Sequence, residues 1–133
     1  MIIGYTSGVF DMLHVGHVIF LQECKNNCDV LHVGVDSDLR VKAMKGSFRP
    51  MQPADTRVEN VSKHCDYAFI KQDVSSVYIN KIKPSIIFES SLKKNIKIDR
   101  ESQYTCIKIP YTDFISTTKI IEENWRAYIQ AEV

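Results

Sequence analysis

The sequence has little of what marks membrane, secreted or disordered proteins. No apolar run approaches the roughly 20 residues that cross a bilayer, so no membrane span is expected. The N-terminus lacks a basic segment ahead of an apolar one and does not resemble a secretory signal. Four scattered cysteines are too few for a disulfide framework, and five glycines and four prolines do not indicate disorder. A reduced, cytoplasmic setting is therefore expected.

An excess of charge is also lacking, because 17 Lys and Arg are balanced by 16 Asp and Glu. A net charge of +1 gives no general attraction to nucleic acid or to an acidic membrane surface, so neither is expected as a partner. Any phosphate binding must then depend on a local arrangement of side chains and backbone N–H groups. The length of 133 residues suits a single domain, 1–133, that is large enough to bury its own core.

Short apolar, β-branched runs alternate with helical patterns along the chain. Strands are predicted at Ile2–Ser7, Val30–Val35, Tyr67–Ile70, Ser85–Phe88 and Thr105–Ile109. Helices are predicted at Gly16–Asn26, Pro53–Lys63, Val74–Lys83 and Ser116–Ala131, and a polar loop with room for one helical turn at Asp36–Met51. This alternation predicts a mainly parallel sheet with helices on both faces and ligands beyond the carboxyl ends of the strands.

The first predicted strand is followed by a segment that contains several potentially catalytic residues, Gly8-Val9-Phe10-Asp11-Met12-Leu13-His14-Val15-Gly16-His17. His14 and His17 are three residues apart at a helix start, which puts both rings on one side of the first turn. The free N–H groups at a helix N-terminus suit a phosphate, and Gly8 and Gly16 let the backbone approach it closely. The imidazoles are expected to donate hydrogen bonds to phosphate oxygens as charge develops there.

This G-x-F-D-x-x-H-x-G-H segment resembles the signature of the cytidylyltransferase-like nucleotidyltransferase family. Two further family-like segments follow in the right order: Lys45-Gly46-Ser47-Phe48-Arg49-Pro50 with Pro53 and Arg57 behind it, and Ile115-Ser116-Thr117-Thr118. The basic segment is most similar to that of heptose-phosphate adenylyltransferases, and the chain also resembles glycerol-3-phosphate cytidylyltransferases. The expected fold is α/β, a Rossmann-like three-layer sandwich whose five-stranded, mainly parallel sheet has the order 3-2-1-4-5.

The resemblance implies roles for individual residues. The implied catalytic residues are His14, His17, Lys45 and Thr117, and the implied nucleotide-binding residues are Gly8, Val9, Phe10, Asp11, Gly16, Lys42, Glu89, Ile115, Ser116 and Thr118. Lys42 or Lys45 would neutralise triphosphate charge, and Arg57 would grip the phosphate of the acceptor. Mg²⁺ would bridge triphosphate oxygens and keep several waters, so no residue is assigned as its ligand. Asp11 would either contact the ion indirectly or hold its own loop by accepting backbone N–H bonds.

These features predict transfer of a nucleoside monophosphate from a nucleoside triphosphate to a phosphorylated sugar or polyol, with release of pyrophosphate. The phosphate oxygen of the acceptor is already ionised at neutral pH, so no general base is needed. Catalysis would consist of positioning and of stabilising charge on the transferring phosphate and the leaving group. The resemblance also implies a homodimer.

Two segments depart from the family pattern. Where the family usually has a G-D type turn after the fourth strand, this chain has Phe88-Glu89-Ser90-Ser91-Leu92, and Glu89 is expected to substitute as the acceptor for ribose hydroxyls. Tyr111-Thr112-Asp113-Phe114 lacks the arginine and glycine of the R-T-E-G found in many cytidylyltransferases, and Asp113 resembles the acidic position of the heptose-type enzymes. This favours ATP over CTP. A glycerol-3-phosphate-type cytidylyltransferase that uses CTP, a flavin adenylyltransferase and a nucleotide-binding module without catalysis are the alternatives.

Other potentially reactive side chains fit structural roles. Cys24 and Cys28 are spaced to share one helix face, but further ligands with zinc-like spacing are absent, so they are expected to be buried thiols. His32 lies within a predicted strand and His64 near a helix end, and both are expected to be structural.

Overall fold

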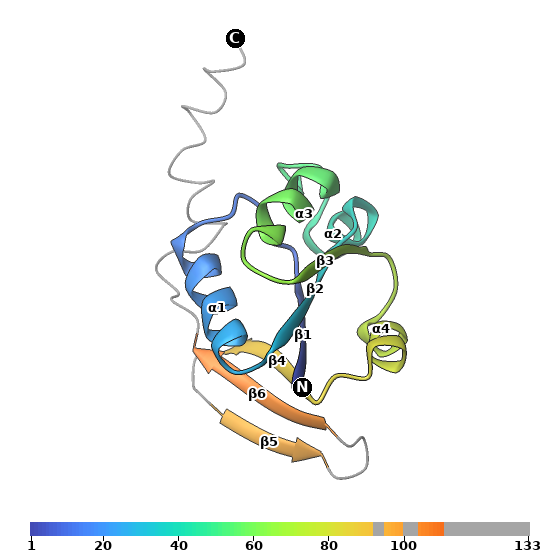
Figure 1. Cartoon of the computed structure of the whole chain (residues 1–133). Coiled ribbons are helices and arrows are strands. Elements are labelled where there is room, and N and C mark those ends of the chain that lie inside the picture. The colour runs from blue at the N-terminus through green and yellow to red at the C-terminus, as the bar shows by residue number, and fades with distance from the viewer. Residues whose placement is uncertain (92–94, 100–103, 111–133) are drawn as a thin grey trace.

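The computed structural model describes residues 1–91, 95–99 and 104–110 of the chain. Its strands are β1 (Ile3–Gly8), β2 (Val30–Asp36), β3 (Tyr67–Lys71), β4 (Ile86–Ser91), β5 (Asn95–Asp99) and β6 (Tyr104–Pro110), and its helices are α1 (Val15–Asn26), α2 (Asp38–Lys45), α3 (Ala54–Ser62) and α4 (Ser75–Ile82) (Figure 1). None of these helices is long and apolar enough to cross a membrane. The predicted helix at 116–131, the segment 115–118 and Asp113 lie outside the described residues.

The described strands form one sheet with the order β3-β2-β1-β4-β6-β5. The first five strands in this order are parallel, which confirms the predicted five-stranded order 3-2-1-4-5. The edge strand β5 pairs antiparallel with β6 and was not predicted. Its sequence, Asn-Ile-Lys-Ile-Asp, has only two apolar residues, and the pairing with β6 that makes it a strand is a tertiary contact.

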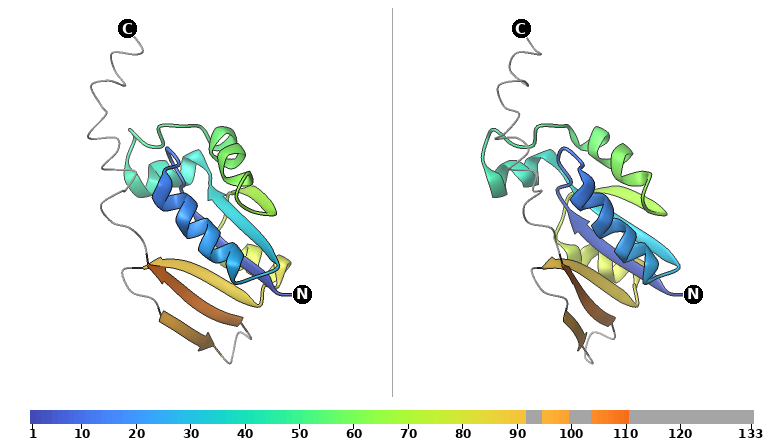
Figure 2. Two further views of the ribbon diagram at one scale, coloured as in Figure 1. Left: turned by 60° about the vertical axis from the view of Figure 1, so that its left-hand side comes forward. Right: turned by 90° about the vertical axis from the view of Figure 1, so that its left-hand side faces the viewer.

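The two faces of the sheet are covered differently. Helices α1 and α4 lie on opposite faces (Figure 2). The face under α1 and α3 holds the apolar core, whose buried members include Phe20 and Leu21 of α1, Val33 of β2, Val61 of α3 and Phe88 of β4. Because successive side chains of a strand alternate between faces, the intervening residues of β2 point toward the α4 face. That face is polar near the carboxyl ends of the strands.

The segment that was predicted as a loop contains helix α2. The Oγ atom of Ser37 caps it by accepting the N–H of Arg40 at 3.3 Å, and Gly46, with φ 98°, ends it. The helix has only eight residues and Val41 is its one buried side chain, so its apolar periodicity is too weak to detect. In the sequence, the capping Ser37 and the terminal Gly46 were the features that could have indicated this helix.

Candidate active site

The candidate site lies at the carboxyl end of β1, where the chain passes through residues 9–14 into α1. In the sheet order, β1 lies between β2 and β4, so the strands that follow it in the chain are placed on opposite sides of it. Such a reversal of strand order is where open parallel sheets bind ligands. Residues 8–17 therefore occupy the place that the sheet topology favours for a ligand.

His14 and His17 hold each other in place through the first turn of α1. The Nδ1 atom of His14 accepts the N–H of Gly16 at 3.1 Å, and the Nδ1 atom of His17 accepts the N–H of His14 at 3.3 Å. The two rings stack with their centroids 3.9 Å apart. Since each Nδ1 accepts a hydrogen bond, it carries no proton, and each neutral imidazole must carry its proton on Nε2. The structure thus presents two Nε2–H donors side by side.

Burial keeps these histidines neutral. The pKa of His17 is lowered to about 3, chiefly by burial and further by the neighbouring His14 and by the positive charge of Lys45. Burial also lowers the pKa of His14. The influence of Lys45 places its charge within electrostatic range of His17, although its side chain is exposed at the end of α2. Lys42 is likewise exposed on α2.

Asp11 joins residues 9–14, here called the histidine loop, to the segment that follows α2. Its fully buried carboxylate accepts the N–H of Met51 at 2.7 Å and that of Gln52 at 3.0 Å, and it pairs with Nε of Arg49 at 3.3 Å. The side chain of Gln52 in turn accepts the N–H of Met12 at 3.1 Å. Of the two roles considered for Asp11, the structure supports the one in which it holds the loop by accepting backbone N–H bonds.

The backbone of residues 8–12 is tightly turned. Phe10 and Met12 both have positive φ, 51° and 56°, which is uncommon for residues with side chains. The buried ring of Phe10 folds back over Gly8, where an added Cβ would lie 3.0 Å from it, and meets His17 edge-on at 5.6 Å. Gly8 is therefore needed for the Phe10 ring, a reason other than the close ligand approach that the sequence suggested.

Arg57 is completely buried and ties three loops together. Its guanidinium donates to the carbonyl oxygens of Val9, Asp36 and Gln52 at 2.8, 2.8 and 2.9 Å and to the carboxylate of Asp38 at 2.7 Å. These four bonds occupy all three nitrogens of the guanidinium. The predicted grip on an acceptor phosphate stays a prediction, while the observed role is to organise the edge of the site.

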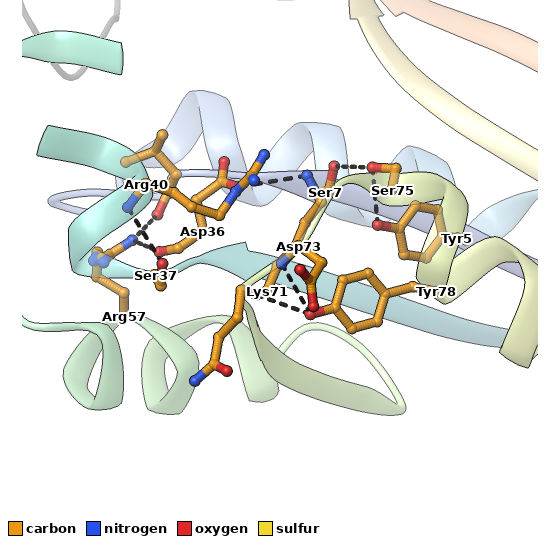
Figure 3. A network of polar contacts seen from close by, with 12 residues as sticks. Tyr5, Ser7, Asp36, Ser37, Arg40, Arg57, Lys71, Asp73, Ser75 and Tyr78 are labelled. Atoms are coloured by element: carbon orange, nitrogen blue, oxygen red, sulfur yellow. Dashed lines mark hydrogen bonds and ion pairs between the residues drawn. The ribbon is translucent and has the colours of Figure 1, made fainter. Parts of the chain in front are cut away.

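A second charged cluster, which sequence reasoning missed, lies on the α4 face (Figure 3). Asp36, the last residue of β2, pairs with Nε of Arg40 at 3.2 Å and with Nζ of Lys71, the last residue of β3, at 3.5 Å. Next to it the hydroxyl of Tyr5 donates to Ser75 at 3.1 Å. The feature of the sequence that could have indicated this cluster is Lys71, a charged residue at the end of the otherwise apolar strand YAFIK.

The remaining predicted residues are not brought together by the described part of the structure. Glu89 is exposed near the end of β4 and is registered beside Lys108 of β6. Gly16 is buried in the first turn of α1. Ile115, Ser116, Thr117 and Thr118 lie outside the described residues. In the part of the chain that is described, no group of three His, Cys, Asp or Glu side chains is arranged to hold a metal ion.

Comparisons with known proteins agree with this geometry. A family model described as cytidylyltransferase-like matches residues 5–123. The chain is 36% identical to the bifunctional protein HldE of Nitratiruptor sp. over 122 residues, 89% of the chain and 26% of that protein. It is 34% identical to HldE of Helicobacter pylori over 129 residues, 93% of the chain and 28% of that protein. The chain thus spans about a quarter of the length of these curated relatives.

A solved structure has the same architecture. The lipopolysaccharide core biosynthesis protein from Thermoplasma volcanium GSS1 superposes with a TM-score of 0.70 at 26% sequence identity, over 85% of this chain and 99% of that chain. The sheet order and the flanking helices are therefore those of a known fold.

The low pKa of His17 predicts a measurable pH dependence of stability. Below pH 6.5 the unfolded chain protonates this histidine, whereas the folded chain keeps it neutral down to a pKa of about 3. The unfolded state then binds more protons, so the stability that is fully present above pH 6.5 falls as the pH drops toward 3, by up to about 1.4 kcal/mol per unit. In the His17→Asn variant the amide oxygen can still accept the N–H of His14. The free energy of unfolding of this variant should depend less steeply on pH, because the contribution of His17 is missing. Urea unfolding at pH 7, 6 and 5 measures it, and identical slopes in the two proteins would contradict it.

The buried contacts of Asp11 predict a local effect on the loop. The Asp11→Asn change removes the charge that pairs with Arg49, and breaking such a buried pair costs roughly 3–5 kcal/mol. Hydrogen exchange at the amides of Met51 and Gln52 should accelerate, and the urea midpoint should fall. The matched control, Asp73→Asn, alters an exposed carboxylate and should change stability by less than about 0.5 kcal/mol. If the two amides exchanged as slowly in Asp11→Asn as in the wild type, Asp11 would not be what holds the loop in place.

Proposed function

We propose that this chain, which belongs to the cytidylyltransferase-like family of nucleotidyltransferases, transfers a nucleoside monophosphate from ATP to a phosphorylated sugar or polyol. The observation that carries the proposal is the pair of neutral imidazoles whose Nε2–H donors lie side by side at the start of α1. A helix N-terminus adds backbone N–H groups and a partial positive charge, which suit a triphosphate.

In the proposed reaction an oxygen of the acceptor phosphate attacks the α-phosphorus of ATP. A new P–O–P bond forms, the bond from the α-phosphorus to the bridging oxygen of the β-phosphate breaks, and pyrophosphate leaves with that electron pair. His14 and His17 donate hydrogen bonds to oxygens that gain charge in the transition state. Because both rings are neutral at pH 7, they act as dipolar donors and leave most of the charge compensation to the lysines.

The other predicted residues complete this site in the proposal. Lys45, and with it Lys42, would face the triphosphate from α2. Thr117 and its neighbours Ile115, Ser116 and Thr118, at the start of the helix predicted from the sequence, would also bind it. Glu89 accepts hydrogen bonds from the ribose. Since both oxygens of Asp11 already accept protein N–H bonds, Mg²⁺ would arrive on the triphosphate and keep waters as its other ligands. A homodimer in the cytoplasm is part of the same proposal.

The preference for ATP and for a sugar phosphate rests on the sequence and on the nature of the relatives. Asp113 and the K-G-x-x-R-P segment resemble the heptose-type adenylyltransferases. A solved structure that shares this fold is that of a lipopolysaccharide core biosynthesis protein, and a lipopolysaccharide contains sugars. Both observations support an acceptor of the sugar-phosphate class.

Pyrophosphate release with a panel of substrates tests the proposal. ATP and CTP are each combined with sugar phosphates, glycerol 3-phosphate and flavin mononucleotide in the presence of Mg²⁺. We expect the highest kcat/KM for ATP with a sugar phosphate. A higher value for CTP with glycerol 3-phosphate, or for ATP with the flavin, would replace the proposed substrates. Triphosphate binding without turnover on any acceptor would identify a binding module.

The donor role of His14 is tested by a variant that spares the helix. Asparagine is a good N-cap residue, so His14→Asn keeps an acceptor for the Gly16 N–H while removing the Nε2–H donor. We expect kcat to fall about 10²–10³-fold with an unchanged melting temperature, as for the loss of one transition-state donor. The matched change His64→Asn, at the far end of α3, should leave kcat within twofold. An unaltered kcat in His14→Asn would remove the histidine from the mechanism.

A further inference from the structure

The ammonium group of Lys71 is buried with too few partners. The residue is only 6% exposed. The described structure gives its Nζ atom one contact, to the Oδ1 atom of Asp36 at 3.5 Å, although an ammonium has three N–H groups to donate. Taking such a charge out of water is costly unless its donors are satisfied. The site is therefore short of hydrogen-bond acceptors.

Gly34 shapes the path of the Lys71 side chain. A Cβ at position 34 would lie 3.3 Å from Cδ of Lys71 and 3.2 Å from the ring of Phe69. The stem of Lys71 thus lies across β2 at its glycine, and Gly34 is registered with Ser7 of β1. The lysine leans from β3 over β2 in the direction of β1, the strand that carries the histidine loop (Figure 3).

The ion pairs of this cluster place one carboxylate between two cations, because Asp36 pairs with both Arg40 and Lys71. Asp73, the other carboxylate drawn in Figure 3, forms no ion pair with either cation in the part of the chain that the structure describes. Arg40 uses Nε on Asp36, and no hydrogen bond joins its two terminal nitrogens to the described residues. Its side chain is 27% exposed, so these nitrogens face the solvent edge of the cluster. Arg40 and Lys71 therefore both have N–H donors that the described residues do not use.

Uncharged hydrogen-bond donors lie beside the cluster of Asp36, Arg40 and Lys71. The hydroxyls of Ser7 and Ser75 lie 3.4 Å apart, and Ser75 is the first residue of α4. No side chain caps this helix start, and the N–H of Val77 donates to the carbonyl oxygen of Val74 at 3.2 Å. The helix N-terminus adds a partial positive charge at this place. The helix follows β3 within four residues and begins at the carboxyl edge of the sheet, next to Lys71.

We propose that Lys71 and Arg40, positioned by Asp36 and Gly34, bind the phosphate group of the acceptor. This inference rests on the proposed function, and it gives to these two residues the task that the sequence had suggested for Arg57. Arg57 has its guanidinium engaged by four protein oxygens, whereas Lys71 and Arg40 have donors to spare. From this position the acceptor would be held at the carboxyl ends of β2 and β3, the same edge of the sheet at which the chain leaves β1 for the histidine pair.

The experiment compares Lys71→Met, which keeps the length of the side chain and removes its charge, with Lys63→Met, a matched change at an exposed lysine on the opposite edge of the sheet. Pyrophosphate release is measured with the best acceptor from the panel. In Lys71→Met the KM for the acceptor should rise about 10- to 100-fold, as for the loss of a charge-assisted hydrogen bond, while the KM for ATP stays within twofold. Lys71→Arg should recover at least part of the lost affinity. Lys63→Met should match the wild type.

Two outcomes would overturn the inference. One is an unchanged KM for the acceptor in Lys71→Met, and the other is an equal rise in the KM for ATP, which would indicate general damage. If the wild-type chain turns over no acceptor, the proposed function fails by itself, and binding of inorganic phosphate, followed by ³¹P NMR, decides the inference. Weaker phosphate binding in Lys71→Met than in Lys63→Met supports the anion site, and equal binding refutes it. If Lys71→Met does not fold, Lys71→Arg and Arg40→Gln are compared in the same assays with the same criteria.

Discussion

The hydrogen bonds by which His14 and His17 cap α1 determine most of the chemistry available at this site. They use the Nδ1 atoms as acceptors for backbone N–H groups, so the same contacts that begin the helix also fix which ring nitrogen carries the proton. Burial of His17 under Phe10 then removes the charged form. A helix start, a tautomer and a protonation state are thus set by one arrangement of two residues.

Two buried charges, Asp11 of the segment after β1 and Arg57 of α3, keep that arrangement at the edge of the sheet. Asp11 reaches residues about 40 positions later in the chain, and Arg57 joins the carbonyl groups of Val9, Asp36 and Gln52. A buried ion is tolerable only when its hydrogen bonds are satisfied, so each of these groups constrains several backbone positions at once. The histidine loop, the start of α2 and the segment before α3 therefore form one connected structure.

The parts of the fold that depend on local apolar pattern were predictable, and the parts that depend on distant partners were not. Apolar strands such as β2, and α1 with its buried Phe20 and Leu21, were found within one or two residues of their bounds. Helix α2 buries only Val41, which is too little to leave a helical period, and β5 is a five-residue edge strand whose pairing partner is the later strand β6. For the site, the histidine pair is local and was predicted. The partner of Lys71 lies 35 residues away, and nothing in the sequence between them specifies that contact.

The two faces of the sheet differ in how completely their side chains are satisfied. Beneath α1 and α3, close-packed apolar groups bury one another, and no ligand is needed to explain them. On the α4 face Gly34 gives up packing surface so that a charged stem can cross it, and the charge at the end of that stem has one long contact. Taking that ammonium out of water costs free energy, which a single long contact offsets only in part. An anion that completes the hydrogen bonds of Lys71 is the partner that would offset the rest of this cost.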